Sequence, residues 1–250
     1  MSSTGGPTGV WCSPSRHPSV LVASLAYVGY RELPPPAPLR ELVETAWVVD
    51  GPGDAVRVLP DGCMDLIRMH GRVVVAGPDT EVSVSARGPE PFAGLRFRPG
   101  ALPRLLGVPA SELRNQRVAL DDLGTVAGGR PLAELAQELA SRAPRTETAP
   151  WSLSTLRGVT ARLAAGAPVA RVAHDAGWSN RTLQRHSHAV YGYGPATLRR
   201  VLRFRRAVAM LRTGQSPADV AAAAGYADQP HLHREVRALA STTVADLACG

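Results

Sequence analysis

Two groups of polar side chains near the C-terminus fall at the spacing that gathers residues on one face of a helix. The first group contains Asn180, Arg181, Gln184, Arg185 and His188, and the second contains Gln229, Pro230, His233 and Arg234. Residues three or four positions apart lie together on a helix surface, so each group forms one stripe. Arginine can pair with guanine through two hydrogen bonds, and glutamine with adenine in the same way. Both groups therefore have the chemistry to read base edges in a major groove.

The two groups belong to a sequence that occurs twice. The string VAHDAGW at residues 172–178 returns as VAAAAGY at residues 220–226. In each copy a glycine, Gly177 or Gly225, falls where one helix must end and the chain must turn sharply, a left-handed position that glycine adopts at least cost. The residues expected to cap the next helix are Ser179 and Asp228. Each copy is thus predicted to be a helix-turn-helix motif. The predicted helices span residues 152–165, 169–176 and 180–191 in copy one, and 217–224 and 229–239 in copy two.

The stretch between the copies, residues 195–213, is predicted to be one long amphipathic helix. It has no interior helix breaker, and arginines are interleaved with apolar residues along it. A helix of this length spans roughly 28 Å, which is close to the roughly 34 Å between successive major-groove faces. One chain could then place both reading helices in neighbouring grooves, with the basic face of the connector, including Arg203, near the phosphates.

Basic residues are concentrated on the repeat. Residues 151–250 hold 13 arginines against 5 acidic residues, whereas residues 1–150 hold 15 arginines against 16 acidic residues. Such asymmetry between halves indicates that one half meets a polyanion and the other does not. No apolar run approaches the roughly 18 to 20 residues needed to span a bilayer, so a cytoplasmic protein without a membrane partner is expected.

Residues 151–250 resemble the DNA-binding domain of the AraC/XylS family of transcription regulators, in which two such motifs are joined by a long helix. The resemblance rests on the pattern A-x-x-x-G-[W/Y] in both copies, on L-x-R after each turn, on G-x-x-P at residues 192–195 and on the longer turn of copy two. It implies base contacts from Arg181, Gln184 and Arg185 in copy one. The residues that it implies for copy two are Gln229, Pro230, His233 and Arg234.

The same resemblance sets the expected partners and processes. Double-stranded DNA, read in the major groove, is the first partner, and the role is regulation of transcription. A small-molecule effector, RNA polymerase and a second copy of the chain forming a homodimer are the further partners that it allows. No cofactor and no metal ion are expected.

The N-terminal half is predicted to be β-rich, which makes the whole chain an α+β protein. Short strand-like runs alternate with Gly, Pro and Asp turns, a spacing typical of a small barrel or sandwich. The runs are residues 46–49, 55–59, 64–69, 72–76, 82–86 and 94–98, and the helical segments are 39–46, 102–106, 110–115 and 131–141. Through LPDGCMDLI at 59–67, AGP at 76–78 and GLRFRPG at 94–100 this half resembles a poorly characterised domain that accompanies some of these regulators. That resemblance implies a cupin-like effector or dimerisation domain.

Composition shifts divide the chain into expected parts. A flexible N-terminus is predicted over 1–24, a β-rich domain with C-terminal helices over 25–142, a linker over 143–150 and the DNA-binding domain over 151–250.

Three residues of the N-terminal half are candidate ligand contacts: Cys63, Asp65 and Arg96. Each also has a structural interpretation. Cys63 lacks an adjacent basic cluster that would activate its thiol, so a half-buried small side chain is the commoner outcome. Asp65, like Asp61, could serve a strand end or turn. Arg96 and Arg98 alternate with apolar residues and could project together from one sheet face, most simply as surface side chains.

Two other functions remain open at this point. One is an enzyme addressed to DNA, such as an alkyl-transfer repair protein, but the three scattered cysteines Cys12, Cys63 and Cys249 do not provide the four-cysteine metal site that it requires. The other is a non-sensing DNA-binding protein whose N-terminal domain only dimerises. The sequence favours a DNA-binding regulator over an enzyme, but does not decide between a sensing and a dimerising N-terminal domain.

Overall fold

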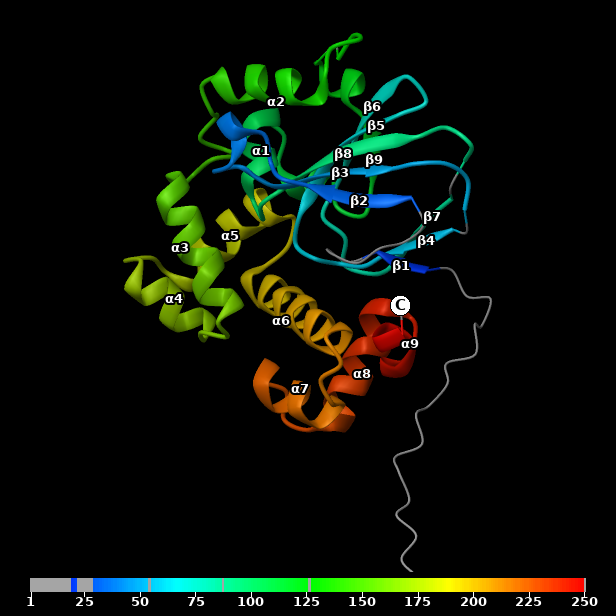
Figure 1. The fold of residues 1–250 in the computed structure, drawn as a ribbon. Coiled ribbons are helices and arrows are strands. Elements are labelled where there is room, and N and C mark those ends of the chain that lie inside the picture. Colours follow the sequence, from blue (N-terminus) through cyan, green and yellow to red (C-terminus); the bar gives the residue numbers. More distant parts are fainter. Residues whose placement is uncertain (1–18, 22–28, 54, 87, 126, 250) are drawn as a thin grey trace, which may run out of the picture.

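The computed structural model describes residues 19–21, 29–53, 55–86, 88–125 and 127–249 (Figure 1). The predicted flexible N-terminus lies outside the described residues except for Ser19–Leu21, which form strand β1. The N-terminal half holds two sheets. The strands of the larger, in spatial order, are β2 (Tyr30–Leu33), β3 (Val43–Val49), β8 (Phe92–Phe97), β5 (Met64–Met69), β6 (Arg72–Ala76) and β9 (Arg117–Ala119). The smaller sheet contains β1, β4 (Val56–Val58) and β7 (Ser83–Ser85).

The α+β class is confirmed, and the β-rich part is a pair of sheets rather than a closed barrel. All neighbouring strands of the larger sheet run antiparallel. Within the described residues, its edge strands β2 and β9 do not pair with each other, so this sheet stays open.

Two predicted helical segments of this half are not α-helices in the structure. Residues 110–115 form only the 3-10 turn Ala110–Glu112. Residues 39–46 were expected to be helical, but only a single 3-10 turn, Ala37–Leu39, precedes strand β3, which begins at Val43. Along β3 the residues alternate between buried and half-buried, as expected for a strand between two packed layers. The β-branched residues Val43 and Thr45 favour this conformation. Strands β2 and β9 are additions that the sequence pattern did not indicate.

The two faces of the larger sheet have different neighbours. Leu66, Val75, Leu95 and Phe97 point to one face and join the core beneath helices α1 (Ala101–Leu106) and α2 (Leu132–Ser141). The residues that alternate with them point to the opposite face, toward the smaller sheet. This alternation places Arg96 between the two sheets rather than on the surface.

Helices make up the rest of the described chain after residue 152. They are α3 (Leu153–Ala164), α4 (Val169–Asp175), α5 (Asn180–Tyr191), α6 (Pro195–Arg212), α7 (Pro217–Ala224), α8 (Gln229–Ala240) and α9 (Val244–Cys249). The two predicted motifs and the connecting helix are confirmed, and α9 is an additional element. Figure 1 shows α6 running from the α3–α5 group to the α7–α9 group below the sheets. Among the described residues, no helix is long and apolar enough to cross a membrane.

Candidate nucleic-acid interface and ligand cavity

The reading helix of copy one, α5, is built as the sequence predicts. Gly177 turns the chain with φ +71°, and the Ser179 hydroxyl then accepts a hydrogen bond of 3.0 Å from the backbone N–H of Thr182, which satisfies a free donor of the first turn. Leu183 is fully buried. The predicted polar side chains Asn180, Arg181, Gln184 and Arg185 are exposed, and His188 is half-buried.

The reading helix of copy two, α8, repeats this construction with different residues. Gly225 turns the chain with φ +80°, and the Asp228 carboxylate accepts a hydrogen bond of 2.6 Å from the N–H of His231. Leu232 is fully buried. The predicted residues Gln229, Pro230, His233 and Arg234 are all exposed.

Both reading faces carry the same glutamine–histidine pair one turn apart. Gln184 Nε2 lies 3.0 Å from His188 Nε2 on α5, and Gln229 Nε2 lies 3.5 Å from His233 Nε2 on α8. These contacts hold the amide groups in a defined position on the exposed faces.

The arginines of the reading helices keep their charge available. Among the described residues, no carboxylate forms an ion pair with Arg181, Arg185 or Arg234. Nη2 of Arg185 lies 3.4 Å from Nε2 of His186. An unpaired guanidinium beside exposed amides can approach a phosphate or a base edge without first breaking an internal ion pair.

Copy one holds its reading helix with an aromatic cluster that the sequence pattern did not indicate. The rings of Trp151 and Trp178 stack 5.2 Å apart at 6°. Trp151 Nε1 donates a 3.1 Å hydrogen bond to Nδ1 of His186 on α5. Burial, and then the charge of Arg185, lower the pKa of His186, which keeps the ring neutral as an acceptor. The signal in the sequence was Trp151 at the start of the first helix and Trp178 directly after the turn glycine.

Copy two holds its reading helix with charges. Arg200 Nε on α6 donates to Glu235 on α8 at 2.9 Å, and Arg203 Nη2 lies 3.5 Å from the same carboxylate. Arg203 also stacks over the ring of Tyr226 at 4.4 Å from its centroid. Its side chain is 26% exposed, so it contributes to packing as well as to the surface.

A groove on the connecting helix separates the two motifs. Its volume is about 320 Å³, and Arg199, Arg203 and Arg206 line it from α6, with residues 164–166 on one side and 223–225 on the other. These three arginines recur at the spacing of one helix face. The groove is therefore a basic surface between the two reading motifs.

A second cavity, of about 410 Å³, lies between the two sheets of the N-terminal half. Trp47, Phe92 and Val74 of the larger sheet face Val56 and Val58 of the smaller sheet across it. Asp65 and Arg96 supply polar groups. A cavity of this size with mostly apolar walls and a few polar groups has the features of a small-molecule site.

The three predicted ligand residues separate in the structure. Asp65 and Arg96 line the cavity, whereas Cys63 is not among its lining residues and lies at the contact with the helical half. The surface interpretation of Arg96 is wrong: its residue is 5% exposed, because it alternates with the core residues Leu95 and Phe97 and so faces the smaller sheet. Arg98 follows the end of β8 and is exposed.

Asp61 caps a turn and Asp65 accepts a hydrogen bond near the start of a strand, and both also pair with Arg96. Asp61 Oδ1 accepts a 2.8 Å hydrogen bond from the N–H of Cys63, which closes a turn, while Oδ2 pairs with Arg96 at 3.3 Å. Trp47 Nε1 donates to Asp65 at 3.1 Å. Burial raises the pKa of Asp65 to about 6, against the opposing charge of Arg96.

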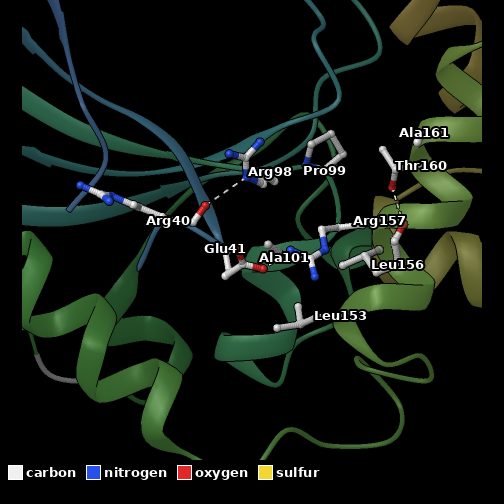
Figure 2. A pocket seen from close by; sticks show the side chains of 10 residues that line it. All are labelled: Arg40, Glu41, Arg98, Pro99, Ala101, Leu153, Leu156, Arg157, Thr160 and Ala161. Atoms are coloured by element: carbon white, nitrogen blue, oxygen red, sulfur yellow. Dashed lines mark hydrogen bonds and ion pairs between the residues drawn. The ribbon is translucent and has the colours of Figure 1, made fainter. Parts of the chain in front are cut away.

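A smaller cleft of about 260 Å³ lies between the N-terminal half and helix α3 (Figure 2). Arg157 of α3 forms an ion pair with Glu41 across it, and Arg98 Nε donates a 3.4 Å hydrogen bond to the carbonyl of Arg40. Figure 2 shows Leu153 and Leu156 of α3 on the wall of this cleft. The arginines that line the cleft, Arg40, Arg98 and Arg157, are exposed. The cleft is therefore open to solvent where the two halves meet.

The two halves also meet at the end of α5. Gly192, the C-cap of this helix, lies so close to the N-terminal half that an added Cβ would approach Pro78 Cγ to 2.6 Å and the carbonyl oxygen of Ala110 to 3.1 Å. Only glycine fits there, both for this space and for its φ of +82°. The N-terminal half therefore fixes the C-terminal end of one reading helix.

Comparison with known families assigns both halves. Residues 172–248 match a family described as "Helix-turn-helix domain", and residues 31–119 match one described as "Domain of unknown function (DUF6597)". Residues 172–248 therefore form an AraC-type helix-turn-helix domain, which supports a role as a DNA-binding transcription regulator. Its N-terminal domain belongs to the family of unknown function.

Solved structures of one protein are similar to this chain. The crystal structure of ToxT from Vibrio cholerae O395 has 8% identity and a TM-score of 0.44, covering 79% of this chain and 95% of that one. A 1.65 Å structure of ToxT from Vibrio cholerae has 8% identity and a TM-score of 0.46, covering 88% and 98%. An unsaturated fatty acid-bound ToxT from Vibrio cholerae strain SCE256 has 8% identity and a TM-score of 0.41, covering 88% and 93%. At these TM-scores the likenesses imply no residue role or ligand for this chain. No curated protein matches the sequence.

Proposed function

We propose that the protein reads an asymmetric DNA site with α5 and α8 placed in successive major grooves. The observation that carries this proposal is the repeated construction: two capped helices, each with a buried leucine and an exposed polar face, joined by the 18-residue helix α6. An 18-residue helix spans roughly 27 Å, which is close to one turn of duplex DNA.

Base contacts in this proposal come from the exposed residues of the two faces and from the half-buried His188. They are Asn180, Arg181, Gln184, Arg185 and His188 on α5, and Gln229, Pro230, His233 and Arg234 on α8. The groove arginines, with Arg203 among them, contact the phosphates between the two patches. We also propose the division into a domain over 25–142, a linker over 143–150 and a DNA-binding domain over 151–250.

The test is a binding selection with the full chain on randomised duplex DNA. It should enrich a non-palindromic site with two conserved patches about one helical turn apart. Arg203→Ala should weaken binding to all sequences to a similar degree, because a phosphate contact carries no sequence information. Arg31→Ala, a change of an exposed arginine in the N-terminal half, is the matched control and should have no effect. Failure of the wild-type chain to enrich any site would contradict the proposal.

We further propose that the chain responds to a small molecule held in the cavity between the sheets. Strand β4 carries this part of the proposal, because successive residues of a strand point to opposite sides. Val56 and Val58 line the cavity. Arg57, between them, donates through Nη1 to the carbonyls of Ala240 at 3.2 Å and Ser241 at 3.1 Å, at the end of the reading helix α8.

The residues that follow β4 also contact both the cavity and the helical half. Leu59 is 2% exposed and belongs to the core of copy two. Asp61 turns back to pair with Arg96 at the cavity. Gly62 then lies against Leu202 of α6, and Cys63 Sγ is 3.5 Å from Nη1 of Arg205 on the same helix. Displacement of residues 56–63 by an occupant of the cavity would therefore move contacts of α6 and α8.

A double-mutant cycle tests this response. Val58→Phe places a ring in the cavity, and we expect it to change the affinity for the selected DNA site by about three-fold or more. Arg57→Ala should remove most of that change, since it cuts the contact between β4 and α8. Independent, additive effects of the two substitutions in folded protein would contradict the response and favour an N-terminal domain that only dimerises.

A further inference from the structure

The guanidinium of Arg96 is buried at the cavity, and within the described residues one of its nitrogens makes no hydrogen bond. Its Nε lies 3.3 Å from Asp61 Oδ2 and 3.7 Å from Asp65 Oδ1, and its Nη1 lies 3.6 Å from Glu32 Oε1. Within the described residues, Nη1 has no hydrogen-bond partner. A buried donor without an acceptor is costly. Because Arg96 lines the cavity, a small shift of its guanidinium toward a bound molecule would give Nη1 that acceptor.

The charges around this donor oppose an anionic occupant. Three carboxylates surround the single guanidinium of Arg96. The other arginine of the cavity, Arg117, is already held by both oxygens of Asp79, at 3.0 and 2.7 Å. The raised pKa of Asp65, due mainly to burial, shows that this site resists negative charge. A carboxylate placed beside Arg96 would add another negative charge near Asp65.

A cationic occupant is opposed by Arg96 itself. To reach Asp65 or Glu32 a cation would have to approach the guanidinium that both carboxylates already neutralise. Its charge would also lose hydration against walls that are largely aliphatic and aromatic, a cost that only close pairing repays.

The walls require an apolar body. Trp47 and Phe92 meet edge to face with ring centroids 5.9 Å apart, and Ile67 and Val74 extend this surface along the larger sheet. Val58 closes the opposite side. The cavity volume of about 410 Å³ is in the range of sites for small organic molecules.

We propose that this cavity binds an uncharged, largely apolar molecule whose carbonyl or hydroxyl oxygen accepts a hydrogen bond from Nη1 of Arg96. The inference names the ligand class of the effector site proposed above and rests on that proposal for its regulatory meaning, though not for binding itself.

A matched series of naphthalenes tests the ligand class by calorimetry on the full chain. 2-Acetonaphthone carries a neutral carbonyl, 2-ethylnaphthalene lacks the oxygen, 2-naphthoate carries a negative charge and 2-naphthylmethylammonium a positive charge. We expect the ketone to bind about ten-fold or more tightly than each of the other three. Tightest binding of the carboxylate or the ammonium compound, equal binding of all four, or no binding of the ketone would overturn the inference.

Two variants locate the binding. Arg96→Met replaces the guanidinium with an unbranched apolar side chain and so removes the donor. The ketone should then lose its advantage over 2-ethylnaphthalene. Because this change removes the positive charge beside three carboxylates and can unfold the domain, Asp65→Asn provides the second measurement. It removes one negative charge with little change of shape, and 2-naphthoate should gain about ten-fold in affinity relative to the ketone. An unchanged ratio in Asp65→Asn would overturn the assignment to this cavity.

The experiments distinguish an error in the inferred ligand class from an error in the proposed response to the ligand. Wrong selectivity in calorimetry contradicts the class. If the ketone binds with the expected selectivity but leaves the affinity for the selected DNA site unchanged, the class stands and the proposed response to this cavity is contradicted.

Discussion

The two helix-turn-helix copies have the same helices and turns but complete their cores differently. Within the described residues, the buried core of copy one is built entirely from residues 151–202. The core of copy two also contains Leu59 of the N-terminal half, with Val82 packed against it. Copy one secures its reading helix with stacked tryptophans, whereas copy two uses the ion pairs of Glu235.

This difference shows that equal local sequence patterns do not imply equal dependence on the rest of the chain. Copy one meets the N-terminal half mainly at the end of α5 and along α3, where Gly192 and Arg157 make contacts. Copy two shares a hydrophobic core with that half. Changes in the N-terminal half should therefore reach α8 more strongly than the aromatic cluster beside α5.

The largest expected effect follows from removing the shared core residue. Leu59→Ala should lower the free energy of unfolding by about 2–4 kcal/mol, because it leaves a cavity in a buried apolar cluster. Hydrogen exchange should accelerate in α7–α9 more than in α3–α5. Leu33→Ala, at a residue 43% exposed, is the control and should change little. Equal acceleration in both motifs would remove the distinction between the copies.

The reading residues should differ in which base pairs they affect. Arg185→Ala should remove roughly 1–3 kcal/mol of discrimination at base pairs in one patch of the selected site, and Arg234→Ala a similar amount in the other patch. Binding selections with each variant measure both. If either substitution reduced affinity without altering preference at any position, that residue would contact phosphate and not a base.

The ion pair between the halves should make stability depend on pH. Burial alone would raise the pKa of Glu44, but the charge and hydrogen bonds of Arg205 on α6 outweigh it and hold the pKa below its ordinary value. A lowered pKa in the folded state stabilises the fold above the ordinary carboxyl pKa of about 4.3. That contribution is lost as the pH falls further, through the folded-state pKa.

Glu44→Gln tests this contribution. At pH 7 the variant should be about 1–2 kcal/mol less stable than the wild type in denaturant unfolding. The difference should shrink as the pH falls below about 4.3. Glu90→Gln, which changes an exposed carboxylate of the N-terminal half, is the control. A difference that stayed constant across the acidic range would contradict the role of this ion pair.

The smallest effect is expected within copy two alone. Glu235→Gln removes the charge that Arg200 and Arg203 share and should cost about 1 kcal/mol of stability, less at high salt. The loss should be detected as faster hydrogen exchange in α8, with α5 unaffected. Equal stability of variant and wild type at low salt would show that packing, including Arg203 on Tyr226, suffices to hold this helix.

The helical half could be predicted closely because its signals are local. Turn glycines, capping residues and the 3.6-residue spacing of Leu183 or Leu232 depend only on neighbours in the chain. The N-terminal half was harder. Residues 43–46 of the expected helix 39–46 belong to strand β3, because pairing with β2 and β8 decides their conformation, and those partners lie elsewhere in the sequence.

The candidate site also has one part that the sequence predicts and one part that depends on packing. The exposed faces of α5 and α8 follow from periodicity. The positions of Trp151 against His186, and of Arg203 against Tyr226, depend on packing between helices that periodicity does not specify. Arg96 shows the limit most clearly: alternation placed it on one face of a strand, but only the second sheet made that face an interior.

By itself, the sequence determined two capped reading motifs, the helix between them and the basic charge of that half, because each is encoded by residues a few positions apart. The tertiary structure decided that Leu59 completes the core of copy two and that β4 lies between a cavity and α8. It also buried Arg96 with one N–H that makes no hydrogen bond to the described part of the chain. These features arise where distant segments pack together, and the energy of such contacts depends on the three-dimensional arrangement and not on the order of residues along the chain.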